Sequence, residues 1–216
     1  MRPVLILRPQ PGADATAERT RAVGLLPIVA PLFRIVPLDW SMPERPFQAI
    51  LLTSANAARS LGTEPDRDIP VYAVGAATAE AARAAGFETV TAGRGDVSQV
   101  VRRAAADGIA SMLHPTGVDR TGFDPEGMRI DVRPVYSAEP VEPGAAFDEA
   151  LAQDAVAMLH SARAARRFRD LAGSGHRIAA ISGAVLAAAG DRWVATAVAD
   201  RPTDDALLAA AASLCH

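Results

Sequence analysis

Three positions in the chain combine a small polar residue or a glycine with the start of an Ala-rich stretch. Ser54, Gly75 and Ser161 each follow a short aliphatic run, and Asn56 and Thr78 lie just inside the first two stretches. Where such a stretch forms a helix, its first backbone N–H groups are unpaired and carry partial positive charge, so they bind carboxylates or phosphates. The predicted chemistry is anion binding by neutral donors. The competing interpretation is that these residues only cap helices.

Three further side chains could act beside these donors. Arg8 ends the first aliphatic run and could bind an anionic ligand or pair with a carboxylate of the protein itself. His114 could be a binding residue or a hydrogen-bonded loop residue. Tyr136 lies in a segment flanked by proline, where its ring could pack between domains or its hydroxyl could serve as a weak acid.

The composition excludes several kinds of chemistry. All 22 basic residues are arginine, so the chain has no Schiff-base lysine, P-loop lysine or Ser-Lys dyad. The four histidines and the single Cys215 lack the spacing of metal ligands, so we predict no metal site. The formal net charge is −3 with both signs scattered along the chain, which shows no nucleic-acid footprint. The basic run 166–169 is either a solvated helix face or a contact for an acidic ligand.

These residues must be positioned by strands and helices that alternate along the chain. Short aliphatic runs have the length of buried strands, and the Ala-rich stretches between them have the length of helices. We predict strands at 4–7, 49–52, 71–74 and 111–113, and helices at 14–23, 55–61, 78–85 and 97–106. The alternation predicts an α/β fold with mainly parallel sheet, in which ligands bind at the carboxyl ends of the strands.

The chain also contains an internal repeat. Segment 52–59 (LTSANAAR) aligns with segment 159–166 (LHSARAAR), and two further segments align at nearly the same offset. The repeat equates Ser54 with Ser161, Gly75 with Ser182, and Arg8 with His114. We therefore predict two homologous α/β halves.

Two stretches interrupt this pattern. Residues 27–38 and 132–141 are apolar but punctuated by proline, which denies them helix interiors. They suit edge strands or linkers between domains.

The sequence resembles the uroporphyrinogen-III synthase family. The segments that carry the resemblance are LILRP at 5–9, LTSANA at 52–57, AVGAATA at 73–79, PVY at 134–136 and PTDDALL at 202–208. They occur in order over nearly the whole chain. The resemblance implies two flavodoxin-like parallel-sheet domains joined by two linker strands, with the active site in the cleft between them. The expected division is 1–35 plus 138–216 for a discontinuous first domain, and 36–137 for the second.

The resemblance also implies a reaction. The family's substrate is hydroxymethylbilane, a linear tetrapyrrole with many carboxylates. The enzyme, a hydro-lyase that needs no metal or organic cofactor, removes its hydroxyl as water and closes the ring with the D ring inverted. Tyr136 matches the family tyrosine that hydrogen-bonds or protonates the leaving hydroxyl. The substrate-binding positions that we predict are Arg8, Ser54, Asn56, Gly75, Thr78, His114, Ser161 and Ser182.

The sequence departs from the family pattern at two places. The second Gly-x-x-Thr pattern is replaced by Ser182 to Val185, and His160 stands where threonine is common. The departures at Ser182 and Val185 would be the evidence for the alternative, a non-catalytic two-domain binding module for a small anionic ligand. A receiver-like or interaction protein of flavodoxin type is a further rival, but it would need an acidic cluster at the strand ends, where this chain has Arg8, Ser54, Gly75 and His114.

The sequence shows neither a targeting segment nor a membrane span. We expect a cytoplasmic enzyme of haem or related tetrapyrrole biosynthesis. We expect it to be a monomer that makes at most a transient contact with the preceding pathway enzyme.

Overall fold

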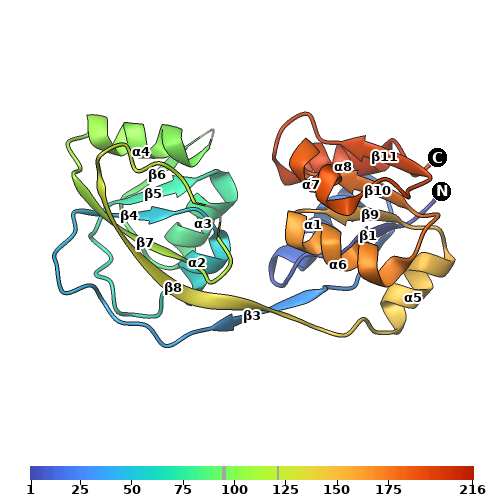
Figure 1. Ribbon diagram of the computed structural model, residues 1–216, viewed down its shortest axis with the longest axis horizontal. Helices are drawn as coiled ribbons and strands as arrows, with labels where there is room; N and C mark the ends of the chain where they lie inside the picture. Colours follow the sequence, from blue (N-terminus) through green and yellow to red (C-terminus); the bar gives the residue numbers. More distant parts are fainter. Residues whose placement is uncertain (94–95, 121) are drawn as a thin grey trace. The chain divides into compact units, whose positions relative to one another are not determined.

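The computed structural model describes residues 1–93, 96–120 and 122–216, which form two compact units (Figure 1). Unit 1 combines Met1–Arg34 with Glu139–His216, and unit 2 is the continuous segment Ile35–Ala138. The chain therefore leaves unit 1, builds unit 2 and returns. Strands β3 (Phe33–Pro37) and β8 (Arg129–Pro140) each contain one of the two boundaries.

Unit 1 is built around a five-stranded sheet in the order β11-β10-β9-β1-β2, and its paired strands run parallel. The strands are β1 (Val4–Ile6), β2 (Pro27–Val29), β9 (Val156–Leu159), β10 (Arg177–Ala180) and β11 (Ala195–Val198). The helices are α1 (Gly12–Ala22), α5 (Ala145–Ala152), α6 (Ala162–Ala172), α7 (Gly183–Ala189) and α8 (Asp204–Ala212). Every residue of β1 and β9 is buried, as expected for central strands of a sheet covered on both faces.

Helices α1 and α8 cover one face of this sheet. Ala13 and Ala17 of α1 and Leu207 of α8 pack against Val4 and Met158 in a single apolar cluster. On α6, Phe168 is fully buried and its ring stacks on Trp193 at 5.5 Å between centroids. The small alanines of α1 let the helix approach the sheet closely, which suits a chain with few aromatic residues.

Unit 2 is built around a six-stranded sheet in the order β3-β8-β7-β4-β5-β6. Besides β3 and β8, its strands are β4 (Ala49–Leu52), β5 (Val71–Val74), β6 (Val90–Gly93) and β7 (Ser111–Gly117). Its helices are α2 (Ala55–Ser60), α3 (Ala76–Ala84) and α4 (Val97–Ala106). Helices α2 and α3 pack on the face that carries Ile50 and Leu52, and α4 packs on the face that carries Leu51 and Met112.

The predicted α/β class with parallel sheets is confirmed, and the predicted strands are found at β1, β4, β5 and β7. The main difference is the length of β7, which continues through Pro115 to Gly117. Thr116 pairs with Pro134 of β8 and Gly117 pairs with Tyr136, so the ladder between β7 and β8 shifts its register between Thr116 and Gly117. The predicted helix 78–85 begins earlier, at Ala76, because Gly75 serves as its N-cap.

Among the helices of the described residues, none has both the length and the apolar character needed to cross a membrane.

Candidate functional site

In unit 2 the structure brings Tyr136 and Ser54 into contact. Ser54 is the N-cap of α2, and its Oγ accepts a hydrogen bond from the Asn56 backbone N–H at 3.1 Å. The Tyr136 hydroxyl donates to the same Ser54 Oγ at 3.2 Å. The phenol therefore lies at the start of a helix, where partial positive charge favours a developing anion. Residues 82 positions apart in the chain thus form one polar group.

The position of the Tyr136 ring depends on Gly117 of the neighbouring strand. The two residues are paired in the β7–β8 ladder just after the register shift, and the Val118 N–H donates to the Tyr136 carbonyl at 3.0 Å. A Cβ atom added to Gly117 would lie 2.8 Å from Tyr136 Cζ and 3.0 Å from its hydroxyl oxygen. The first separation is shorter than real Cβ contacts, and the second is tighter than most of them. Gly117 is thus required for this ring position. It was not among the predicted site residues, although a glycine that ends a strand is a recognisable signal.

His114 lies inside unit 2, only 1% exposed, and its Nε2 is 3.1 Å from the hydroxyl oxygen of Thr53. The ring also meets the edge of Phe123. Burial, with a smaller contribution from the positive charge of Arg120, lowers the pKa of His114 to about 4. The imidazole is therefore neutral at pH 7 and holds the residue that precedes Ser54. Its contact with a ligand stays a prediction.

Gly75 and Thr78 belong to the start of α3, which follows the strand adjacent to β4. Gly75 has φ +84°, a backbone conformation that residues other than glycine rarely adopt, and the space where its Cβ would lie is open. Thr78 is buried in the first turn of α3. Since β4 and β5 are parallel neighbours, Ser54 and Gly75 lie at the same edge of the unit 2 sheet. Asn56 is half-buried on α2 and accepts a bond from Arg59 at 3.4 Å.

Ser161 and Ser182 cap helices in unit 1 as Ser54 does in unit 2. Ser161 Oγ accepts from the Ala164 N–H at 3.2 Å, and Ser182 Oγ accepts from the Val185 N–H at 3.4 Å. They follow the adjacent parallel strands β9 and β10. The capping interpretation therefore holds for all three serines, while their contact with a ligand stays a prediction.

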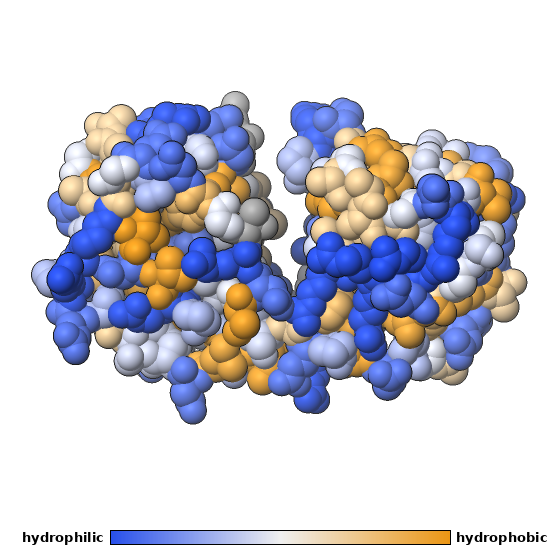
Figure 2. All heavy atoms as spheres, in the orientation of Figure 1, coloured by the Kyte–Doolittle hydropathy of each residue, from blue (hydrophilic) through white to orange (hydrophobic). Residues whose placement is uncertain are grey.

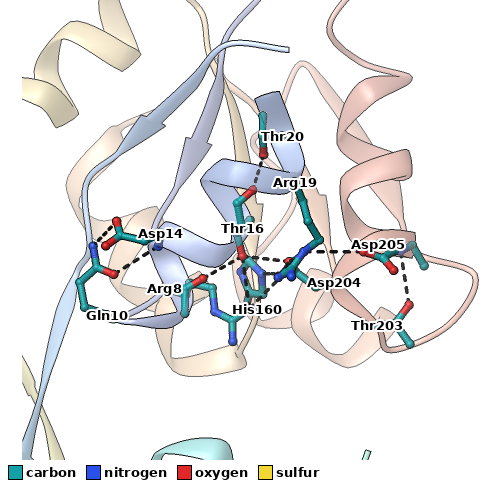
Figure 3. Close-up of polar contacts among 12 residues, drawn as sticks. Arg8, Gln10, Asp14, Thr16, Arg19, Thr20, His160, Thr203, Asp204 and Asp205 are labelled. Carbon is teal, nitrogen blue, oxygen red and sulfur yellow. Dashed lines mark hydrogen bonds and ion pairs between the residues drawn. The ribbon is translucent and has the colours of Figure 1, made fainter. Parts of the chain in front are cut away.

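Arg8 lies in a polar network centred on Asp204 (Figure 3). Its Nη1 donates to Asp204 Oδ1 at 3.1 Å, and Arg19 Nε donates to Oδ2 at 2.9 Å. The fully buried Thr16 donates its hydroxyl to Oδ2 at 2.9 Å, and His160 Nε2 lies 2.6 Å from Oδ1. This one carboxylate joins helices α1 and α8 with the segments that follow β1 and β9. The geometry supports the interpretation in which Arg8 pairs with a carboxylate of the protein.

The ionisation of this network follows from burial and neighbouring charge. Burial alone would raise the pKa of Asp204, but the hydrogen bond from His160, together with Arg19 and Arg8, holds that pKa well below its usual range. Burial lowers the pKa of His160 and the charge of Arg8 lowers it further, against the opposing effect of Asp204. The network is therefore an ionised carboxylate held by two guanidinium groups and a neutral imidazole. Asp204 was not among the predicted site residues, although the first turn of a helix is a usual place for an acidic residue.

Within the described residues, no group of three or more His, Cys, Asp or Glu side chains is arranged to hold a metal ion.

Comparison with known proteins places this fold and its motifs in a family. A family model described as "Uroporphyrinogen-III synthase HemD" matches residues 14–209. No curated protein matches the sequence significantly. The crystal structure of uroporphyrinogen-III synthetase from Helicobacter pylori 26695 is similar with a TM-score of 0.67 and 17% identity, covering 99% of this chain and 100% of that chain. A mutant uroporphyrinogen III synthase from Thermus thermophilus has a TM-score of 0.46 and 14% identity, covering 98% of each chain.

At such low identity the likeness to the Helicobacter pylori structure shows the fold. The family model, in contrast, matches the sequence itself and extends over most of it. Its matched range includes Ser54, Gly75 and Tyr136. The chain belongs to the uroporphyrinogen-III synthase family.

Proposed function

We propose that this chain catalyses the reaction of its family with the Tyr136 hydroxyl as the acid. Hydroxymethylbilane loses its hydroxyl as water and closes to uroporphyrinogen III with the D ring inverted. The family match does not favour the non-catalytic binding module. The observation that carries the assignment of the acid is the 3.2 Å hydrogen bond between Tyr136 Oη and Ser54 Oγ at the start of α2.

The acid step begins with breaking of the carbon–oxygen bond of the hydroxymethyl group. Tyr136 Oη gives its proton to the departing oxygen, which leaves as water, and the electron pair of the adjacent pyrrole nitrogen stabilises the resulting cation. The Ser54 hydroxyl retains a proton that it can donate to the phenolate. The partial positive charge at the start of α2 stabilises the same phenolate.

The later steps need little from the protein beyond holding the chain folded. The D ring attacks the cation through its substituted carbon and forms a spiro intermediate. Cleavage of the older carbon–carbon bond regenerates a cation on the neighbouring ring, and the unsubstituted carbon of the D ring then closes on it. The proton lost from that carbon balances the proton given by Tyr136, so water is the only by-product. Such catalysis is mainly positioning.

The carboxylates of the substrate need donors, and we assign them to the helix starts. Backbone N–H groups beside Ser54 and Gly75 in unit 2, and beside Ser161 and Ser182 in unit 1, follow the carboxyl ends of parallel strands. Neutral donors of this kind bind carboxylates without requiring a cation for each. The open space at Gly75 allows a ligand to approach the backbone closely.

The function is tested with freshly prepared hydroxymethylbilane and separation of the two product isomers. The purified protein is expected to give the type III isomer, whereas spontaneous closure gives type I. Formation of type I alone, at the rate of the protein-free control, would contradict the proposal.

We expect the enzyme to work in the cytoplasm as a monomer. A transient contact with the enzyme that supplies hydroxymethylbilane would limit its spontaneous closure. Sedimentation of the protein at micromolar concentration tests the first expectation, and a stable dimer would contradict it.

A further inference from the structure

Helix α6 borders a basic groove of about 400 Å³ that lies entirely within unit 1. Figure 2 shows hydrophilic side chains gathered over the face of unit 1 on which α6 lies in the view of Figure 1. The polar lining of the groove includes Arg166, Arg167 and Arg169 of the basic run 166–169. We call it the α6 groove, and define it by Phe33, Arg163, Arg166, Arg167, Arg169 and Asp170.

Two of these arginines are held in place by the Phe33 ring. The guanidinium carbon of Arg163 lies 4.6 Å from the ring centroid, and that of Arg167 lies 5.9 Å from it. Phe33 itself is buried, with 7% of its surface exposed, so its ring is packed against the protein. Arg167 Nη2 also donates to the Val141 carbonyl at 2.6 Å. These long side chains are therefore already fixed before a ligand binds, so binding costs less side-chain entropy.

The groove retains positive charge after its internal ion pairs are counted. Arg169 Nε lies 3.1 Å from Asp170 Oδ1, and Arg167 Nη2 lies 3.5 Å from the exposed Glu142. Within the described ranges Arg166 has no hydrogen bond or ion pair, and its side chain is exposed on the groove wall. The buried Nε of Arg167 also finds no acceptor among the described residues, which is uncommon for such a group.

We propose that the α6 groove binds carboxylate groups of the tetrapyrrole, an inference that takes its ligand from the proposed function. Guanidinium groups match carboxylates through paired N–H donors and keep their charge at any working pH. The groove is larger than one inorganic ion needs and lies within the size range of small-molecule sites. Arg163 also stands two residues after Ser161, so the groove begins beside a helix start to which we assign a carboxylate.

The test is a fluorescence titration of the whole protein with uroporphyrin III, a stable porphyrin that carries the eight carboxylates of the product. Arg166→Gln is expected to raise the Kd about tenfold, the loss of one charged hydrogen-bonding partner. Glutamine is nearly as good a helix former as arginine, and the side chain is exposed, so the fold is retained. Arg21→Gln on α1, also exposed in unit 1, is the matched control and should leave the Kd unchanged.

Two further arms identify the ligand. Coproporphyrin III, with half as many carboxylates, should bind more weakly to the wild type and lose less affinity on Arg166→Gln. Pyrophosphate should compete poorly with uroporphyrin III. Binding of pyrophosphate in the groove, together with a uroporphyrin Kd that does not depend on Arg166, would overturn the proposal. An unchanged uroporphyrin Kd for both Arg166→Gln and Arg163→Gln would also overturn it.

The titration does not depend on turnover, so its failure can be told apart from failure of the proposed function. If the protein makes the type III isomer but the arginine variants keep an unchanged Kd, the proposed function stands and the proposal for the groove fails. If the protein makes only type I but its affinity for uroporphyrin depends on Arg166, the proposal for the groove stands and the proposed function fails. In turnover assays the Arg166→Gln enzyme should show a raised KM and a smaller change in kcat.

Discussion

At the residue scale, the proposed chemistry depends on one phenolic proton, that of Tyr136. Tyr136→Phe removes the proposed acid and should lower kcat by about 10²-fold or more, the usual contribution of a positioned general acid. Its hydrogen bond to Ser54 is only partly buried, so the free energy of unfolding should fall by about 1 kcal/mol. Steady-state kinetics and urea unfolding measure the two effects.

The second tyrosine provides a matched control for this change. Tyr72 lies in β5, and its hydroxyl donates to Asp107 at 3.0 Å. Tyr72→Phe makes the same chemical deletion away from Ser54, and should cost similar stability while leaving kcat intact. Parallel losses of activity and stability in the two variants would mean that Tyr136 only packs.

The ring of Tyr136 must also be aimed, and this gives a second prediction. Gly117→Ala places a methyl group about where the Tyr136 ring now lies, so the phenol must move. We expect kcat to fall more than KM rises, since the acid rather than the binding donors is displaced. Gly122→Ala, which meets nothing within 4 Å, is the control. In the double variant with Tyr136→Phe the alanine should cause almost no further loss of kcat, and full additivity would contradict a positioning role.

Residue types could be predicted where the cause is local. The three capping serines are recognisable because a helix start needs an acceptor within three residues, and each follows an apolar run. The partners of Arg8 could not be predicted in this way. Arg8 and Asp204 are 196 positions apart, and many carboxylates were equally available in the sequence. A glycine that ends a strand is a recognisable signal, but the constraint on Gly117 comes from the Tyr136 ring on another strand, and the sequence does not show that contact.

At the element scale, Asp204 ties α8 to α1 and to the segments that follow β1 and β9. Asp204→Asn removes the charge that balances Arg8 and Arg19, while the amide keeps nearly the same volume. Since the Asp204 side chain is only 16% exposed, unfolding free energy should drop by about 3 kcal/mol. Calorimetry or urea unfolding measures this loss.

The neighbouring residue supplies the control. Asp205 is 85% exposed and lies 3.6 Å from Arg19. Asp205→Asn should change stability by less than about 0.5 kcal/mol. Equal effects at the two positions would mean that the network adds nothing beyond ordinary helix-start charge.

At the scale of the whole molecule, unit 2 is one continuous segment of the chain, whereas unit 1 is built from two segments. In the sheet of unit 1, β1 lies between β2, from the first of these segments, and β9, from the second. The segment 35–138 carries both covered faces of its own sheet and has the length of an ordinary domain of about 100 residues. We predict that it unfolds cooperatively when expressed alone. A broad, non-cooperative urea transition would contradict this prediction.

Stability of the whole molecule should also depend on pH through His114. Its pKa is about 4 in the folded protein, below the ordinary value of 6.5, so the unfolded chain binds the proton more readily. The stabilisation is therefore complete above pH 6.5 and is lost as the pH falls towards 4, by about 3 kcal/mol in total. His114→Gln can keep the bond to Thr53 without titrating, and should reduce the loss of urea stability between pH 7 and pH 4.5, leaving the part that comes from the lowered pKa of His160. His216 is exposed at the chain end, so His216→Gln should leave the dependence of urea stability on pH as it is in the wild type. The same dependence in His114→Gln would show that buried His114 does not govern the acid sensitivity.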